Sequence, residues 1–155
     1  MSNQTRSPQR NLLMRNLLRA WLPVVLVMCC GCGGPAGPEV VRVTGTVKRG
    51  GRPIESLLVY FEPASGKPSV GKTDSAGKFS LALGSDKQGA VVAKHKVYFQ
   101  FVAPTPQDEM AYQQGTLKVS EDVMVATTKY GTSESSPLLA EVTSKDPQEI
   151  ALVLE

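Results

Sequence analysis

Three cysteines are the residues of this chain whose type and spacing point most directly to chemistry. Cys29, Cys30 and Cys32 lie within four positions, and the 155-residue chain has no other cysteine. A small secreted domain stabilised by disulfides carries paired cysteines within the domain, so we interpret this cluster as a target of processing. A metal-binding CCxC tract is the other interpretation, but neither a histidine nor a further cysteine lies nearby to complete a four-ligand zinc site.

The segment around these cysteines has the layout of an export signal. Residues 1–20 contain four arginines and no acid, and an apolar run follows from Trp21 to Met28. A basic region, a short apolar run and a cluster of small residues, in that order, are typical of a secretory signal. The run is shorter than the roughly 20 apolar residues that a permanent membrane-spanning helix needs. We therefore expect residues 1–31 to be a signal peptide in the form of a helix.

The CCGC cluster also resembles a bacterial lipobox, in which a signal peptidase cuts in front of a cysteine that receives a diacylglyceryl group. Gly31 is the small residue expected before the modified cysteine, which assigns the lipid to Cys32, with Cys30 and Cys29 as alternatives. A plain cleaved signal without lipid is a further alternative. The resemblance implies a protein anchored in the cell envelope, on the periplasmic side or at the cell surface. The Gly- and Pro-rich residues 32–39 would then form a tether.

The net charge of the exported part differs from that of the whole chain. The formal charge of +3 comes from 17 basic and 14 acidic residues, and four of the basic residues are the leader arginines. Removing them leaves 13 basic against 14 acidic residues, a net charge of about −1. Nucleic-acid binding needs clustered Lys and Arg, so we expect no nucleic-acid partner.

Other residues that could do chemistry fit structural roles better. His95 is the single histidine and lies in a strand pattern, which favours packing or hydrogen bonding. Asp74 and Ser75 have the composition of a turn, whereas calcium needs several carboxylates. Three serines and two pairs of adjacent acids have no partner that would activate them. They are Ser133, Ser135, Ser136, Asp108 with Glu109, and Glu121 with Asp122. We expect the acid pairs to face solvent. We expect no catalytic, metal-binding or cofactor-binding residues, and hence no enzyme.

Two tyrosines are candidates for carbohydrate binding. Tyr60 and Tyr98 would face outward if the alternate residues Phe61, Phe99 and Phe101 fill the core. Outward-facing aromatic rings can form a platform for sugars.

The elements that would position these residues are mainly strands. Period-two alternation predicts strands at 40–48, 57–63, around 97–101, at 138–144 and at 149–155, and a tight hairpin over 70–83 with Gly77 in its turn. Residues 107–114 favour one or two helical turns, and a strand is expected around 117–119. Short strands separated by Gly, Pro, Asp and Ser indicate one all-β domain over residues 40–155, an antiparallel sandwich with a single core.

Three sequence motifs resemble the carboxypeptidase regulatory-like domain. Gly45, Val47, Gly51 and Pro53 match its first hairpin, and the run TDSAGKF at 73–79 matches its middle one. The AKHKVYF strand departs from the family pattern, since Ala93 and His95 replace Gly and Tyr, and Thr128 replaces the proline before the Lys-Tyr pair. The resemblance implies a seven-stranded, transthyretin-like antiparallel β-sandwich. More narrowly, the chain is similar to small exported lipoproteins of planctomycete-type bacteria.

These observations lead to two functional expectations. The first is an exported, lipid-anchored, non-catalytic domain that serves as a binding or structural module for an envelope protein or polysaccharide. The alternative is a domain that binds a small ligand or carbohydrate, or an enzyme, with its site in region 104–137.

Overall fold

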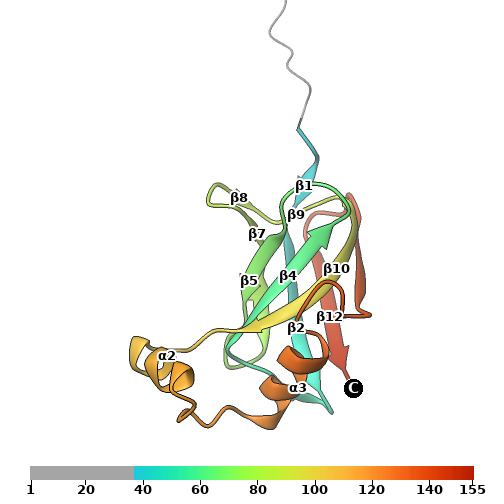
Figure 1. Cartoon of the computed structure of the whole chain (residues 1–155). Coiled ribbons are helices and arrows are strands. Elements are labelled where there is room, and N and C mark those ends of the chain that lie inside the picture. Colours follow the sequence, from blue (N-terminus) through green and yellow to red (C-terminus); the bar gives the residue numbers. More distant parts are fainter. Residues whose placement is uncertain (1–36) are drawn as a thin grey trace, which may run out of the picture. The chain divides into compact units, whose positions relative to one another are not determined.

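The computed structural model of this protein describes residues 37–155 (Figure 1). The predicted signal peptide, Cys29, Cys30, the lipid-attachment residue Cys32 and most of the tether lie outside the described residues. Strands dominate the regular structure and pair mostly in antiparallel sheets, so the domain is β-rich as expected. Within residues 37–155, none of the helices has the length and apolar character needed to cross a membrane.

The larger sheet contains six strands, all paired antiparallel. Its longest strand, β10 (Ala93–Phe101), pairs with β4 (Leu57–Pro63) over seven residues, and the side chains of β4 alternate between buried and half-buried. The strand order is β11 (Leu139–Val142), β10, β4, β5 (Ser69–Lys72), β7 (Ala82–Leu83) and β8 (Lys87–Gln88).

The smaller sheet is built around β2 (Val43–Arg49). It pairs with β12 (Gln148–Leu154), with β3 (Arg52–Pro53) and with β6 (Lys78–Ser80). The β2–β12 pair is parallel, which departs from the expected purely antiparallel arrangement. The reason is that the two last strands belong to different sheets: β11 pairs with β10, and the chain then crosses to lie alongside β2. A short pair, β1 (Val40–Val41) with β9 (Ala90–Val91), lies where the described chain begins.

One hydrophobic core lies between the larger, six-stranded sheet and the smaller, four-stranded sheet. Alternate side chains of each strand are buried in it, as period-two patterns require. The buried apolar residues from these strands include Val43, Val47, Leu57, Val59, Phe61, Val97, Phe99, Leu152 and Leu154. The sequence therefore predicted the buried face of the central strands correctly, although Phe101 is only half-buried.

The hairpin predicted at 70–83 is only partly correct. The predicted turn is present: Gly77 has a φ of 68°, and its N–H donates to the Asp74 carbonyl at 2.9 Å. The strands on either side separate, however: β6 pairs with β2 of the smaller sheet, whereas Ala82 pairs with Val70 of the larger one. The chain changes sheets at Leu81, which is fully buried.

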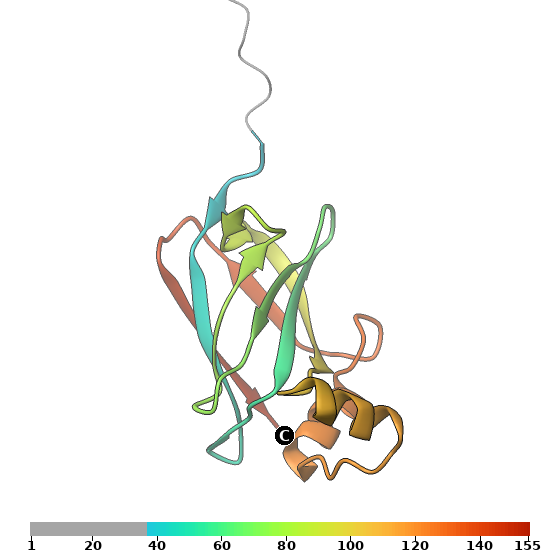
Figure 2. The same ribbon diagram turned by 90° about the vertical axis from the view of Figure 1, so that its left-hand side faces the viewer.

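Two helices lie at the end of the domain opposite residue 37 (Figures 1 and 2). The predicted helical turns at 107–114 are confirmed by α2 (Pro106–Gln113). The strand expected around 117–119 is wrong, since these residues form a connection that leads into α3 (Glu121–Lys129). Val123 and Ala126 of α3 are buried against the core, and this packing outweighs the weak strand pattern.

Candidate functional site

His95 lies in the core, on the inner side of β10. Its side chain is 1% exposed, and its ring packs against Phe61 with 5.8 Å between ring centroids. Nε2 lies 2.8 Å from the Val91 carbonyl oxygen, which can only accept, so this nitrogen carries the proton. Nδ1 has no hydrogen-bond partner within residues 37–155. This arrangement agrees with the expected packing role.

The tyrosine pair lies on the outward face of the larger sheet. Tyr60 and Tyr98 are cross-strand neighbours, and their rings stack 4.7 Å apart at an interplanar angle of 3°. The Tyr60 hydroxyl donates to Gln100 Oε1 at 3.1 Å. Burial raises the pKa of Tyr98, and the negative charge of Glu62 raises it further. Because each ring covers one face of the other, the pair offers a sugar less open ring surface than separate rings would.

The serines and Asp74 stabilise local backbone. Asp74 Oδ1 accepts hydrogen bonds from the N–H groups of Ala76 (2.9 Å) and Lys78 (2.8 Å), which closes the turn. The Ser136 hydroxyl donates to the Val97 carbonyl at 2.5 Å. Ser135 exchanges hydrogen bonds with Thr132, whose hydroxyl donates to Ser135 Oγ at 3.0 Å. The part of the chain that the structure describes contains no group of three or more His, Cys, Asp or Glu placed to hold a metal ion.

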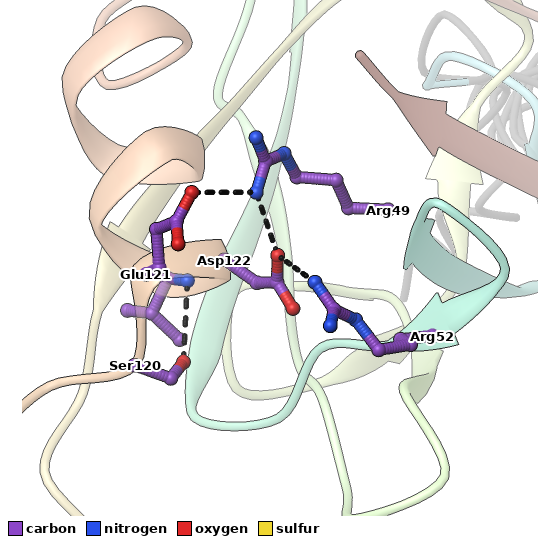
Figure 3. A network of polar contacts seen from close by, with 6 residues as sticks. Arg49, Arg52, Ser120, Glu121 and Asp122 are labelled. Atoms are coloured by element: carbon purple, nitrogen blue, oxygen red, sulfur yellow. Dashed lines mark hydrogen bonds and ion pairs between the residues drawn. The ribbon is translucent and has the colours of Figure 1, made fainter.

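An ion-pair network joins α3 to the smaller sheet (Figure 3). Arg49 Nη1 lies 2.8 Å, and Arg52 Nη2 3.1 Å, from the same oxygen, Asp122 Oδ1. Glu121 Oε1 lies 3.5 Å from Arg49 Nη1. The hydrogen bond from Arg49 lowers the pKa of the Asp122 carboxyl, with Arg52 adding to the effect, and the same contact raises the pKa of Arg49.

The tight β2–β3 turn explains why two arginines reach one acid. Gly50 and Gly51 both have positive φ, 54° and 80°, as a two-residue hairpin turn requires. This turn sets Arg49 and Arg52 directly opposite each other. The expectation that Asp122 faces solvent is wrong, because its side chain is only 16% exposed, whereas that of Glu121 is 82% exposed.

A groove of about 270 Å³ lies beside this network, where the segment after β10 meets the start of β4. Most of its lining comes from region 104–137, which sequence analysis named as a possible site. Apolar side chains are Phe101, Pro104, Leu117, Val119 and Val123, and polar ones are Glu55, Ser56, Asp108, Lys118 and Ser120. Glu55 and Ser120 also line a neighbouring hollow that contains Arg52 and Asp122.

The backbone at the edge of this groove is strained. Ser56 has φ of 62°, the only positive value at a residue other than glycine between residues 37 and 155. Its carbonyl accepts a hydrogen bond from the Val102 N–H at 3.0 Å, which ties the start of β4 to the end of β10. Such conformations persist only where surrounding contacts fix them. Sequence analysis missed this position, since serine carries no signal for a left-handed conformation.

The groove and the tyrosine pair are thus two surface features of residues 37–155 that could receive a ligand, and of these two the groove is concave. The carboxylates, the ammonium group and the apolar side chains of the groove can bind a ligand. The residues that line it include no nucleophile with a base beside it to activate it. Comparisons of the chain with protein-family models, with curated proteins and with solved structures found no match.

Proposed function

We propose that this protein is an exported, lipid-anchored and non-catalytic module of the cell envelope that binds an envelope protein or polysaccharide. The leader, with its basic region, apolar run and CCGC cluster, supports export and attachment at Cys32. The fold we propose is a transthyretin-like, seven-stranded sandwich. The six-stranded and four-stranded sheets, which share one hydrophobic core, support this fold.

One observation carries the non-catalytic part of the proposal: the side chains that could do chemistry hold the fold together. His95 bonds to Val91, Asp74 closes a turn, and Ser136 bonds to Val97. Asp122 joins two arginines, and Asp108 accepts a 2.7 Å hydrogen bond from the Thr105 hydroxyl at the start of α2. A catalytic group needs a partner that tunes it toward a substrate, whereas these groups are held by backbone groups, by the hydroxyl that caps α2 or by structural ion pairs.

Replacing the proposed lipid-attachment residue tests the anchoring. In cells that express Cys32→Ser, we expect the protein in the soluble fraction, because a domain without acyl chains has nothing to hold it in the bilayer. Cys29→Ser is the matched control and should stay with the membranes. Fractionation followed by immunoblotting measures the distribution. Retention of Cys32→Ser in the membrane would contradict the assignment.

The groove favours a second candidate, a small-ligand, carbohydrate-binding or enzymatic domain with its site in region 104–137. Seven of the ten residues that line the groove come from this region. A panel of ester, peptide and glycoside substrates separates the two candidates. Turnover that is lost in Asp108→Asn and retained in Glu141→Gln, whose exposed side chain lies on β11, would favour the second candidate.

A further inference from the structure

The helical end of the domain, which we define as residues 104–129, carries apolar surface that the core does not use. Five large hydrophobic side chains are exposed in residues 37–155, and three of them lie on α2 and α3: Met110 (58%), Tyr112 (46%) and Met124 (56%). Within Pro106–Gln113, α2 contributes no buried residue. An eight-residue helix is marginal without packing, and its one aromatic contact is Tyr112 with Phe101, at 4.7 Å between ring centroids.

The charges that line the groove itself are mainly negative, although Lys129 lies in the last turn of α3 and Arg52, which is paired with Asp122, lines the neighbouring hollow. Glu55 and Asp108 line the groove beside a single cation, Lys118. Glu109 adds a further carboxylate in the first turn of α2, whose last turn has no basic residue. A cationic partner therefore complements this end of the domain.

The size of the groove suits part of a polypeptide better than an enclosed small molecule. At about 270 Å³ it lies at the lower end of the range of roughly 300–1,000 Å³ that is usual for small-molecule pockets. One or two apolar side chains of a protein segment could fill it while the rest of the segment covers Met110 and Met124. Methionine side chains adapt to partners of varied shape and are common on surfaces of this kind.

We propose that the helical end docks a basic, amphipathic segment of a partner protein. Apolar side chains of the segment lie on Phe101, Leu117 and Val119, which are half-buried and line the groove, and its Lys or Arg side chains pair with Glu55 and Asp108. This inference rests on the proposed binding function and names its partner class. The described chain begins at residue 37, at the end of the domain opposite α2 and α3 (Figures 1 and 2).

Methionine-methyl NMR of the full chain in nonionic detergent tests the inference. The probes are three synthetic 12-residue peptides: an amphipathic leucine–lysine peptide, its leucine–glutamate counterpart, and a serine–lysine peptide with the same charge but no apolar face. We expect only the leucine–lysine peptide to shift the methyl signals of both Met110 and Met124. Its affinity should fall between 50 and 200 mM salt, since exposed charges contribute to it.

Variants of the protein distinguish specific docking of the peptide from nonspecific binding. Glu55→Gln with Asp108→Asn should weaken the leucine–lysine peptide about fivefold or more, while Glu141→Gln, an exposed carboxylate on β11, should bind as the parent does. Equal binding of the leucine–glutamate peptide, or an unchanged affinity in the double variant, would overturn the inference. So would methyl shifts that follow protein concentration without peptide, which indicate a second copy, or shifts produced only by oligosaccharides. Mass spectrometry of the amino terminus tests the lipid anchor independently of peptide binding. An unmodified amino terminus would therefore contradict the proposed anchor, whereas absence of peptide binding would contradict only the docking surface.

Discussion

Asp122 is the residue on which the attachment of α3 to the smaller sheet depends most. Its carboxylate accepts from Arg49 and Arg52, which lie 73 and 70 positions earlier in the chain. Replacing it by asparagine should lower the midpoint of thermal unfolding at pH 7, because Arg52 loses its anionic partner and Arg49 keeps only the more distant Glu121. Glu121→Gln is the control and should change the midpoint less, since Glu121 is 82% exposed and 3.5 Å from Arg49.

The effect of Asp122→Asn should also depend on pH. The pKa of Asp122 is lowered from the ordinary value of 3.8 in the folded protein, so its contribution to stability is fully present above that value. The contribution is lost as the pH falls through the lower, folded-state pKa. Thermal unfolding of the parent and the variant should therefore differ at pH 5–7 and converge below about pH 4. A difference that stays constant down to pH 2 would contradict the ion-pair account.

Ser56 offers a test of strain at the groove. A left-handed conformation costs an L-residue roughly 1–2 kcal/mol, and glycine avoids this cost but loses roughly 0.5–1 kcal/mol of chain entropy. Ser56→Gly should therefore leave the free energy of unfolding unchanged or raise it by up to about 1.5 kcal/mol. Ser80→Gly, at an exposed position in β6, should lower it by roughly 0.5–1 kcal/mol. Denaturant unfolding measures both, and a clear loss of stability in Ser56→Gly would refute the assignment of strain.

Single residues were predictable where the cause of their conformation is local. Gly51 was assigned to a hairpin and Gly77 to a turn correctly, since turn composition acts within a few positions. The partners of Asp122 were not predictable, because an ion pair between residues 73 positions apart depends on how the sheets pack.

At the scale of elements, the parallel pairing of β2 with β12 depends on a residue without a side chain. A Cβ at Gly45 would overlap the backbone oxygen of Ile150 on β12 and lie 2.5 Å from the Phe79 ring. Gly45→Ala should therefore lower the free energy of unfolding by about 1–3 kcal/mol, the usual cost of overpacking. Gly37→Ala, where a Cβ meets nothing within 4 Å, is the matched control. Equal stability of the two variants in urea would show that this strand pair tolerates a larger separation.

The strands were predicted better than their pairing. Alternation in 57–63 and around 97–101 is a local signal, and both runs lie in strands whose alternate side chains are in the core. The change of sheet at Leu81 and the parallel pairing of β12 with β2 have no such local signal. A strand pattern shows which face of the strand is buried but not which strand it pairs with.

Helix α3 was missed although a signal for it exists. Val119, Val123, Ala126 and Tyr130 follow one another at spacings of four, three and four residues, which is the helical period. All four contact the core. The polar residues between them and the strand-like run from Leu117 to Val119 obscured this pattern.

At the scale of the whole molecule, the two ends of the described domain have different roles in this account. The chain enters beside β1, and the opposite end carries α2, α3 and the groove (Figure 1). A domain anchored through the first end would present the second to partners in the envelope. The groove could not be outlined from sequence, since its walls come from residues 55–56 and 101–123, which only the folded sheet brings together.

The most direct test of the central claim is mass spectrometry of the amino terminus of the protein purified from the membranes of its host. We predict a chain that begins at Cys32 and carries the added mass of a diacylglyceryl group. A chain with an unmodified amino terminus, or one that retains residues 1–31, would contradict the account.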